Sequence, residues 1–267
     1  MIEPDRAAAA RLSCRVPGAR VSAVLATLSL SFACDRVRDE VARMEARGTA
    51  GSGGQGAGSS AGAAGAGATG EFVASVSFIY WSFQVEADYP GPDDTVLTSQ
   101  SCSPLANVPA DFAANLCIEG SGRLVEGSVV NFDGTCTCGY QCLRTGTTVC
   151  FVLLDPAQFP WGVGSASTPI VPLRSLTVDE SLITHGTVLY TPAWDGVSIP
   201  AQGGVGGFVH DGCFRADDAG YGITGNLVAL AAGPTTMFSW LEATLPSGTE
   251  TWDLYRNTQH CAYLAAP

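Results

Sequence analysis

Short runs of β-branched and aromatic residues recur along the chain from residue 72 onward, and glycine, proline and aspartate separate them. The first run, FVASVSFIYWSF at residues 72–83, alternates as a β-strand with one buried face does. Further runs of this kind are RLVEGSVVNF, TTVCFVLL, LRSLTV, TVLYTP, FVHDGCFRA and NLVAL. In this part of the chain, the stretches at 111–117 and 236–245 predict short helices. Many short strands with few helices favour a mostly β fold that closes, or nearly closes, into a barrel.

A low-complexity segment marks where this β-rich domain begins. Residues 49–70 contain only small or polar side chains, with glycine, alanine and serine dominant. Such a segment buries too little apolar surface to offset its chain entropy, so we expect a flexible linker. The preceding residues 35–48 predict a short charged helix. The folded domain is therefore expected at residues 71–267, which is long enough for one hydrophobic core.

The first 34 residues have the pattern of an export signal. Arg11, Arg15 and Arg20 form a basic stem before a mostly apolar run at 21–33, which is too short to span a bilayer comfortably. The run ends in SFAC, which resembles a bacterial lipobox, although Leu30 lies four residues before Cys34 instead of the usual three. Lipidation of Cys34 would anchor the protein on the periplasmic side of the inner or outer membrane. Secretion and an uncleaved anchor are the alternatives.

The charge distribution narrows the range of partners. All 13 basic residues are arginines, and eight of them lie within the first 47 positions. From residue 48 onward, 19 acidic residues face only five arginines. An acidic domain of this kind repels phosphate backbones, so nucleic acid is not an expected partner. Nothing in the sequence points to a cofactor.

Cysteine usage agrees with export. Besides Cys14 and Cys34, the chain holds eight cysteines, which are disulfide candidates with 105 possible connectivities. These are Cys102, Cys117, Cys136, Cys138, Cys142, Cys150, Cys213 and Cys261. The cluster CTCGYQC at 136–142 raises metal binding as an alternative. It lacks the second half of a paired zinc knuckle, so disulfides are favoured and no metal site is expected.

Two segments resemble the three-aspartate domain family. SLTVDESLITHGTVLYTP at 175–192 is similar to its first motif, and ADDAGYGITGNLVAL at 216–230 is similar to its second. The segments VEADYPG, CIEGSGRLVEGSVVNFDGTCTCG, LLDPAQFPWGVG and GGFVHDGCFRADD extend the likeness over residues 78–261, to a cysteine-bearing subgroup. The resemblance implies a double-psi β-barrel with a six-stranded core, disulfide-linked insertions and a few short helices. It also implies similarity to the membrane-bound lytic transglycosylase A family, which cleaves the glycan strands of peptidoglycan.

Individual residues of this chain can be matched to the aspartates and glycines of the family motifs. Asp179 matches the first family aspartate and Asp218 the second, while Gly220 and Gly222 lie in the glycine-rich turn that follows. The third aspartate falls on Ala229. A lytic transglycosylase needs one carboxyl group that first protonates the glycosidic oxygen and then accepts the proton of the attacking 6-hydroxyl. A methyl group cannot do this.

Other carboxyl groups could take over the role of the missing acid. Asp217 lies next to Asp218 but, by strand alternation, is expected on the opposite face. Glu86 and Glu119 are expected from other parts of the barrel. With Asp218 and Asp179, Asp217 and Glu86 are the catalytic candidates. The alternatives are buried structural aspartates, or a calcium loop at residues 217–222, for which oxygen ligands are too few.

Substrate contacts are predicted at a further set of residues. Glu119 and Arg123 flank two glycines and could contact a sugar or a peptide carboxylate, or else hold a turn as an internal ion pair. Asp211, Gly220 and Gly222 complete the predicted binding set. His185 and His210 are expected to be structural. The aromatic side chains considered for stacking on sugar rings are Tyr80, Trp81, Trp161 and Trp194.

The sequence is compatible with three functions. The first is a lytic transglycosylase of peptidoglycan turnover, and the second is a non-catalytic wall or polysaccharide-binding lipoprotein. The third is a disulfide-stapled extracellular domain with an unrelated partner, because a fold does not fix a function. In the first two cases the expected partner is peptidoglycan or a related glycan, bound by a monomer.

Overall fold

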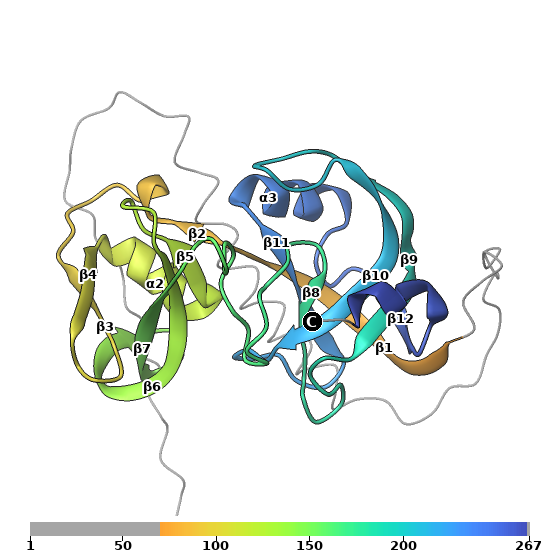
Figure 1. The fold of residues 1–267 in the computed structure, drawn as a ribbon, viewed down its shortest axis with the longest axis horizontal. Helices are drawn as coiled ribbons and strands as arrows, with labels where there is room; N and C mark the ends of the chain where they lie inside the picture. The colour runs from red at the N-terminus through yellow and green to blue at the C-terminus, as the bar shows by residue number, and fades with distance from the viewer. Residues whose placement is uncertain (1–69, 266–267) are drawn as a thin grey trace, which may run out of the picture. The chain divides into compact units, whose positions relative to one another are not determined.

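A closed six-stranded barrel dominates the computed structural model, which describes residues 70–265 (Figure 1). Its strands are β1 (Glu71–Ser82), β8 (Ser175–Thr177), β9 (Val188–Ile199), β10 (Phe208–Asp218), β11 (Leu227–Gly233) and β12 (Thr251–Arg256). Around the barrel they follow the order β1-β11-β8-β10-β9-β12. The β1–β11 and β8–β10 pairs are parallel, and the remaining pairs are antiparallel. The predicted fold class, a mostly β protein with a double-psi barrel, is confirmed.

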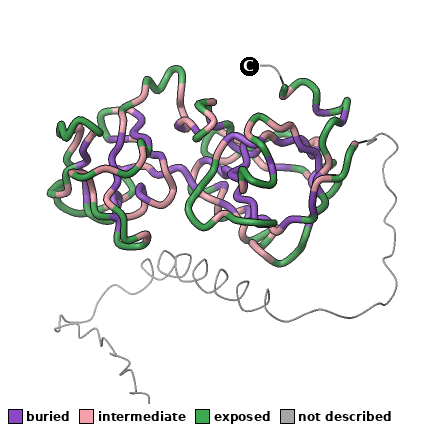
Figure 2. Tube along the Cα trace, turned by 90° about the horizontal axis from the view of Figure 1, so that it is seen from below, coloured by how far each residue is buried: buried purple, intermediate pink, exposed green. Residues whose placement is uncertain are grey.

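The barrel interior is filled by alternate residues of its strands. On β1 these are Val76, Phe78 and Tyr80, so the intervening side chains point outward. Phe78 packs at 4.4 Å from the ring centroid of Trp252. Helix α3 (Thr235–Thr244) contributes Met237 and Leu241 to the same core. Figure 2 shows buried segments running through the interior of the fold while exposed segments lie outside.

Residues 83–163 form a second sheet with its own core, called here the disulfide lobe. Its sheet contains β2 (Gln84–Val85), β5 (Ser121–Arg123), β6 (Val129–Cys142) and β7 (Thr147–Leu154), beside the β3 (Thr95–Thr98) and β4 (Pro104–Val108) hairpin. The short helix η1 (Glu86–Asp88) and helix α2 (Ala110–Glu119) complete it. Glu86 and Glu119 therefore belong to this lobe, and the prediction that they lie in the barrel was wrong. The insertion builds a separate sheet because it carries enough apolar residues for a core of its own.

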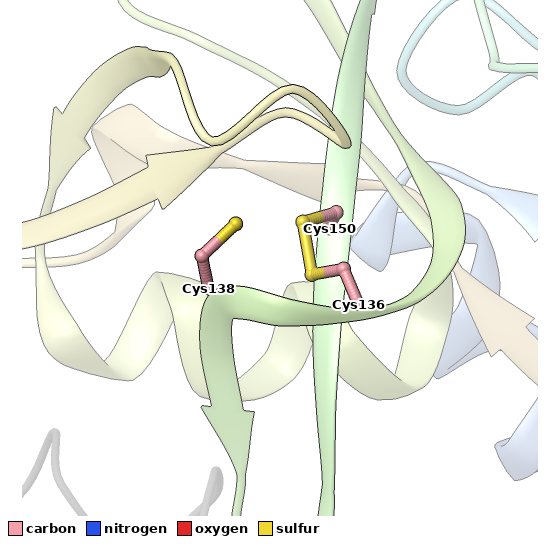
Figure 3. A group of neighbouring side chains, drawn as sticks. All are labelled: Cys136, Cys138 and Cys150. Atoms are coloured by element: carbon pink, nitrogen blue, oxygen red, sulfur yellow. A yellow bond between two sulfur atoms is a disulfide. The ribbon is translucent and has the colours of Figure 1, made fainter.

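Disulfides concentrate in this lobe. Within residues 70–265 the pairs are Cys102–Cys138, Cys117–Cys142, Cys136–Cys150 and Cys213–Cys261. Figure 3 shows the Cys136–Cys150 bond joining β6 to β7, with Cys138 nearby on β6. The first three pairs cross-link the lobe. The fourth ties barrel strand β10 to η2 (Gln259–Leu264). All eight predicted disulfide cysteines are oxidised, which overturns the metal alternative for residues 136–142.

The predictions for the N-terminal part lie outside the described residues. They comprise the export signal with Cys34, the charged helix at 35–48 and the linker at 49–70, of which only Gly70 is described. Among residues 70–265, no helix is both long enough and apolar enough to cross a membrane.

Candidate functional site

A cavity of about 530 Å³ lies between the outer face of the barrel and the disulfide lobe. Trp81 lines it from barrel strand β1, where it points away from the core. The lobe contributes Glu119 and Phe132, and the barrel adds Asp218 and Tyr221 from the end of β10 and the turn after it. Its lining therefore mixes aromatic surface with carboxyl groups. Cavities of this size, lined by both kinds of group, are typical of small-ligand sites.

The adjacent aspartates lie at a β-bulge at the end of β10. Ala216 pairs with Leu176 and Asp218 with Thr177, so β10 advances two residues while β8 advances one. Asp217 accepts a hydrogen bond from Ser175 Oγ and Asp218 one from Thr177 Oγ1. Because Ser175 and Thr177 are two residues apart on β8, they share one face, and both carboxylates reach that face. The prediction that strand alternation separates them was wrong, since a bulge breaks the alternation.

The two aspartates nevertheless have different surroundings. Asp217 is 1% exposed and accepts hydrogen bonds from Arg215 Nε at 2.6 Å and Thr168 Oγ1 at 3.0 Å. Asp218 is partly exposed and borders the cavity. Its Oδ1 accepts the backbone N–H of Ser165 at 2.8 Å. Asp217 is therefore a buried anchor, whereas Asp218 is accessible from the cavity.

Asp179 fixes the turn that precedes β11. Its carboxylate accepts hydrogen bonds from the Ser181 hydroxyl at 2.6 Å and from the Gly225 backbone N–H at 2.7 Å. These bonds hold the pKa of Asp179 below its usual value. In the same turn, Gly222 has a φ of +78°, which disfavours any residue with a Cβ, and Gly220 lines the cavity. Asp179 thus connects the loop after β8 to the turn at 219–226.

Ala229 lies on the barrel face that carries Thr177. It pairs with Thr177 on β8 and with Ile79 on β1. Directly opposed residues in an antiparallel pair project to the same side. The methyl group of Ala229 therefore lies on the side where Thr177 meets Asp218, and it is 4% exposed. No proton donor occupies the position of the third family aspartate.

Glu119 has the most perturbed carboxyl group of the cavity. It is the last residue of α2, where Gly120 ends the helix with a φ of 85°. Its Oε2 accepts the backbone N–H of Ser82 on β1 at 3.1 Å, which links the lobe to the barrel. Burial raises the pKa of Glu119 to about 7, although the Ser82 bond and the charge of Arg144 act to lower it. A large fraction of the Glu119 carboxyl groups therefore carries a proton near neutral pH, about half of them at pH 7.

Arg123 does not pair with Glu119 in the described residues. Its Nη2 donates to the Pro160 carbonyl at 3.2 Å, and the guanidinium carbon lies 5.8 Å from the centroid of the Phe83 ring. Arg123 is also absent from the lining of the cavity. The structure therefore places it beside the interface between β5 and the segment around Pro160, and the alternative of an internal ion pair with Glu119 was wrong.

Two further predicted residues lie away from the cavity. Glu86 is 4% exposed, and its Oε2 accepts the Val125 backbone N–H at 2.8 Å, so it ties η1 to the turn after β5. Asp211 forms an ion pair with Arg174 and accepts a hydrogen bond from Tyr263 at 2.7 Å. Burial acts to raise the pKa of Asp211, but these donors outweigh it and lower the pKa to about 2. Neither carboxylate faces the cavity that Asp218 and Glu119 share.

The predicted structural role of His210 agrees with its surroundings. Its ring stacks on Phe214 at 4.8 Å, and Nδ1 accepts the Gly212 backbone N–H at 2.9 Å. Nε2 lies 2.8 Å from the Leu173 carbonyl oxygen, so the ring carries its proton there. Burial lowers the pKa of His210 to about 4. The ring is therefore neutral at ordinary pH.

The aromatic residues separate into core and cavity positions. Tyr80 and Trp194 are buried in the barrel core, while Trp161 packs edge-on against Phe83 at 5.3 Å. Trp81 alone of the four aromatic candidates lines the cavity, and its buried indole Nε1 has no hydrogen-bond partner in residues 70–265. Phe132 and Tyr221 line the cavity as well and were not predicted. Their neighbours NFDG and AGYG gave no signal beyond turn composition.

Comparison with known proteins gives structural similarity only. No protein-family model matches the chain, and no curated protein matches it. Among solved structures, the chain is similar to Escherichia coli MltA with bound chitohexaose, at 16% identity and a TM-score of 0.45, over 68% of this chain and 71% of that one.

Two further lytic transglycosylases are similar to the chain. The membrane-bound lytic murein transglycosylase of Agrobacterium tumefaciens is 13% identical, with a TM-score of 0.41, over 72% of this chain and 76% of that one. LtgG of Burkholderia pseudomallei is 18% identical, with a TM-score of 0.35, over 69% and 72%. At these values the similarities assign neither a family nor an activity to the chain.

Proposed function

We propose that this protein is an exported cell-wall protein that binds the glycan strands of peptidoglycan in the cavity between the barrel and the disulfide lobe. The observation that carries the proposal is the lining of that cavity. Trp81 and Tyr221 offer aromatic faces, and Asp218 and Glu119 offer carboxyl groups. A sugar ring has apolar faces for the aromatic residues and hydroxyl groups for the carboxylates.

The proposed roles of the site residues follow their positions. Asp218, Glu119 and the Gly220 backbone contact the glycan, whereas Asp179 and Gly222 hold the turn that carries Tyr221. Asp217, Glu86, Arg123 and Asp211 have structural roles. Binding without cleavage is favoured by one observation, which is the methyl group of Ala229 at the position of the third family aspartate.

We expect Tyr221→Ala to weaken binding of the full-length protein to purified peptidoglycan sacculi about tenfold. Tyr221 is 74% exposed at the rim of the cavity, so its removal costs sugar contact and little stability. Loss of one aromatic contact is worth about 1.4 kcal/mol, which corresponds to a factor of ten. A pull-down titration measures the change. Tyr263→Ala is the matched control, because Tyr263 is 54% exposed and lies away from the cavity. Equal affinity of both variants and the wild type would place glycan binding elsewhere.

We further propose that Cys34 carries a lipid anchor that holds the domain at 71–267 near the wall through the linker at 49–70. The SFAC sequence supports this. We expect Cys34→Ala to move the protein from the membrane fraction to the soluble fraction of a bacterial host, because an acylated cysteine supplies the anchoring energy. Unchanged membrane association of this variant would leave the apolar run at 21–33 as the anchor.

A further inference from the structure

We propose that Glu119 is the general acid of this cavity, so that the chain cleaves the glycan it binds although Ala229 cannot. This inference rests on the proposed function. It moves the catalytic carboxyl group from barrel strand β11 to the end of helix α2 in the disulfide lobe. Among the acidic residues that line the cavity, Glu119 alone combines the protonation and the geometry that the reaction requires.

The first requirement is a carboxyl group that is fixed in place with one oxygen available. Glu119 Oε2 is held by the Ser82 backbone N–H at 3.1 Å. In residues 70–265 no protein group donates a hydrogen bond to Oε1, and no arginine forms an ion pair with the carboxyl group. A proton on Oε1 is therefore free to be donated to a ligand. The helix end and the Ser82 bond keep the group in one orientation.

The second requirement is that a proton is present near neutral pH. The charged and titratable groups around Glu119 are Asp133, Asp218 and Tyr221 in the cavity lining, and the exposed Arg144 in the turn between β6 and β7. Burial outweighs the attraction of Arg144, so the pKa of Glu119 rises to about 7. Asp133 is exposed, and Asp218 already accepts two hydrogen bonds.

Trp81 lines the same cavity and carries an unpaired polar group. The indole Nε1 of Trp81 is buried and has no hydrogen-bond partner within residues 70–265. A buried N–H group without a partner costs free energy unless a ligand or water accepts its hydrogen bond.

The reaction needs only this one carboxyl group and no added reagent. Glu119 Oε1 gives its proton to the glycosidic oxygen as the bond between that oxygen and the anomeric carbon breaks. The 6-hydroxyl oxygen of the same sugar then bonds to the anomeric carbon, and its proton returns to Glu119. One C–O bond is broken and one is formed, the carboxyl group recovers its proton, no water is consumed, and the product ends in a 1,6-anhydro ring.

The test compares full-length wild type, Glu119→Gln and Glu126→Gln on peptidoglycan sacculi, with mass spectrometry of the released 1,6-anhydro muropeptides. Glutamine keeps an acceptor for the Ser82 N–H but cannot donate a carboxyl proton, so a structural role of Glu119 survives in this variant. We expect release to fall at least 100-fold in Glu119→Gln, a much larger loss than any fall in pull-down affinity for sacculi, since glutamine can still form a hydrogen bond to the glycan. Glu126 is exposed in the turn between β5 and β6, so Glu126→Gln should behave as the wild type.

The pH profile adds a readout that a structural role would not move. An acid must be protonated before it acts, so wild-type release should decline as the pH rises through about 7. Release by Glu119→Gln at the wild-type rate would overturn the proposal. If wild type binds sacculi but releases no anhydro product, the acid role fails while the binding function stands. If it does not bind at all, the proposed function itself fails.

Discussion

Replacing Asp217 by alanine should lower the free energy of unfolding of the barrel by about 3–5 kcal/mol, the usual cost of removing one partner of a buried ion pair. Asp217 is 1% exposed, and Arg215, Thr168 and Ser175 all donate hydrogen bonds to it. Alanine would leave the guanidinium of Arg215 without its counter-charge, although the side chain of Arg215 is only 18% exposed. It would also leave two hydroxyl donors without an acceptor.

Urea unfolding of the full-length protein with intact disulfides, followed by tryptophan fluorescence, measures this loss. Asp217→Asn should lose less than Asp217→Ala, because the amide oxygen still accepts hydrogen bonds while the charge is gone. Asp93→Ala is the matched control, since Asp93 lies exposed in a loop and should change stability by no more than about 0.5 kcal/mol. An unfolding free energy of Asp217→Ala equal to that of the wild type would mean that this cluster does not stabilise the bulge. Asp217 would then return to the catalytic candidates.

Local sequence pattern predicted several strands and both α-helices well. The run TTVCFVLL is β7 over Thr147–Leu154, and FVASVSFIYWSF overlaps β1 nearly completely. Both helices were expected within two residues of their observed bounds. In such segments the apolar residues that face the core recur about every two residues in a strand and about every 3.6 residues in a helix. This spacing can be read directly from the sequence.

The strand that closes the barrel was not predicted. β12 reads TWDLYR, in which only Trp252 and Leu254 are buried among polar neighbours. It pairs with β1 on one side and with β9 on the other. Such pairing joins segments that are far apart in the chain, so it cannot be predicted from the six residues of β12 alone. The same reason explains why Glu86 and Glu119 were expected in the barrel, since the separate sheet of the lobe depends on which distant strands meet.

The candidate site was predicted in part. The sequence singled out Asp217, Asp218 and the turn that follows them, and the structure places Asp218 and part of that turn at the cavity. The different surroundings of Asp217 and Asp218 depend on the β-bulge at Asp217, which shifts the strand register by one residue. The spacing of apolar residues in the sequence does not indicate this bulge. Glu119 was predicted as a substrate contact, but the raised pKa of its carboxyl group depends on burial against β1, a tertiary fact.

Reduction of the disulfides should unfold the disulfide lobe while the barrel core stays folded. The bridges Cys102–Cys138, Cys117–Cys142 and Cys136–Cys150 join residues 36, 25 and 14 positions apart. Loops of these lengths are worth about 3–4 kcal/mol each, and less in sum because they overlap. The lobe core is small and centres on Phe112, Leu116 and Phe151, so the burial of apolar side chains adds little to the stability of the lobe. The barrel core holds a larger cluster that includes Trp194 and Trp252.

Hydrogen exchange measured by mass spectrometry before and after reduction with dithiothreitol checks this prediction. Amides of β6 and β7 should lose protection, whereas those of β1 and β11 should keep it. The double variant Cys213→Ala/Cys261→Ala is the matched control, because it removes only the bridge between β10 and η2 and should leave the lobe protected. Since the lobe supplies Glu119 and Phe132 to the cavity, reduction should also abolish binding to sacculi, whereas the control variant should still bind. Protection of β6 and β7 that survives reduction would mean that the apolar core, and not the three bridges, holds this wall of the cavity in place.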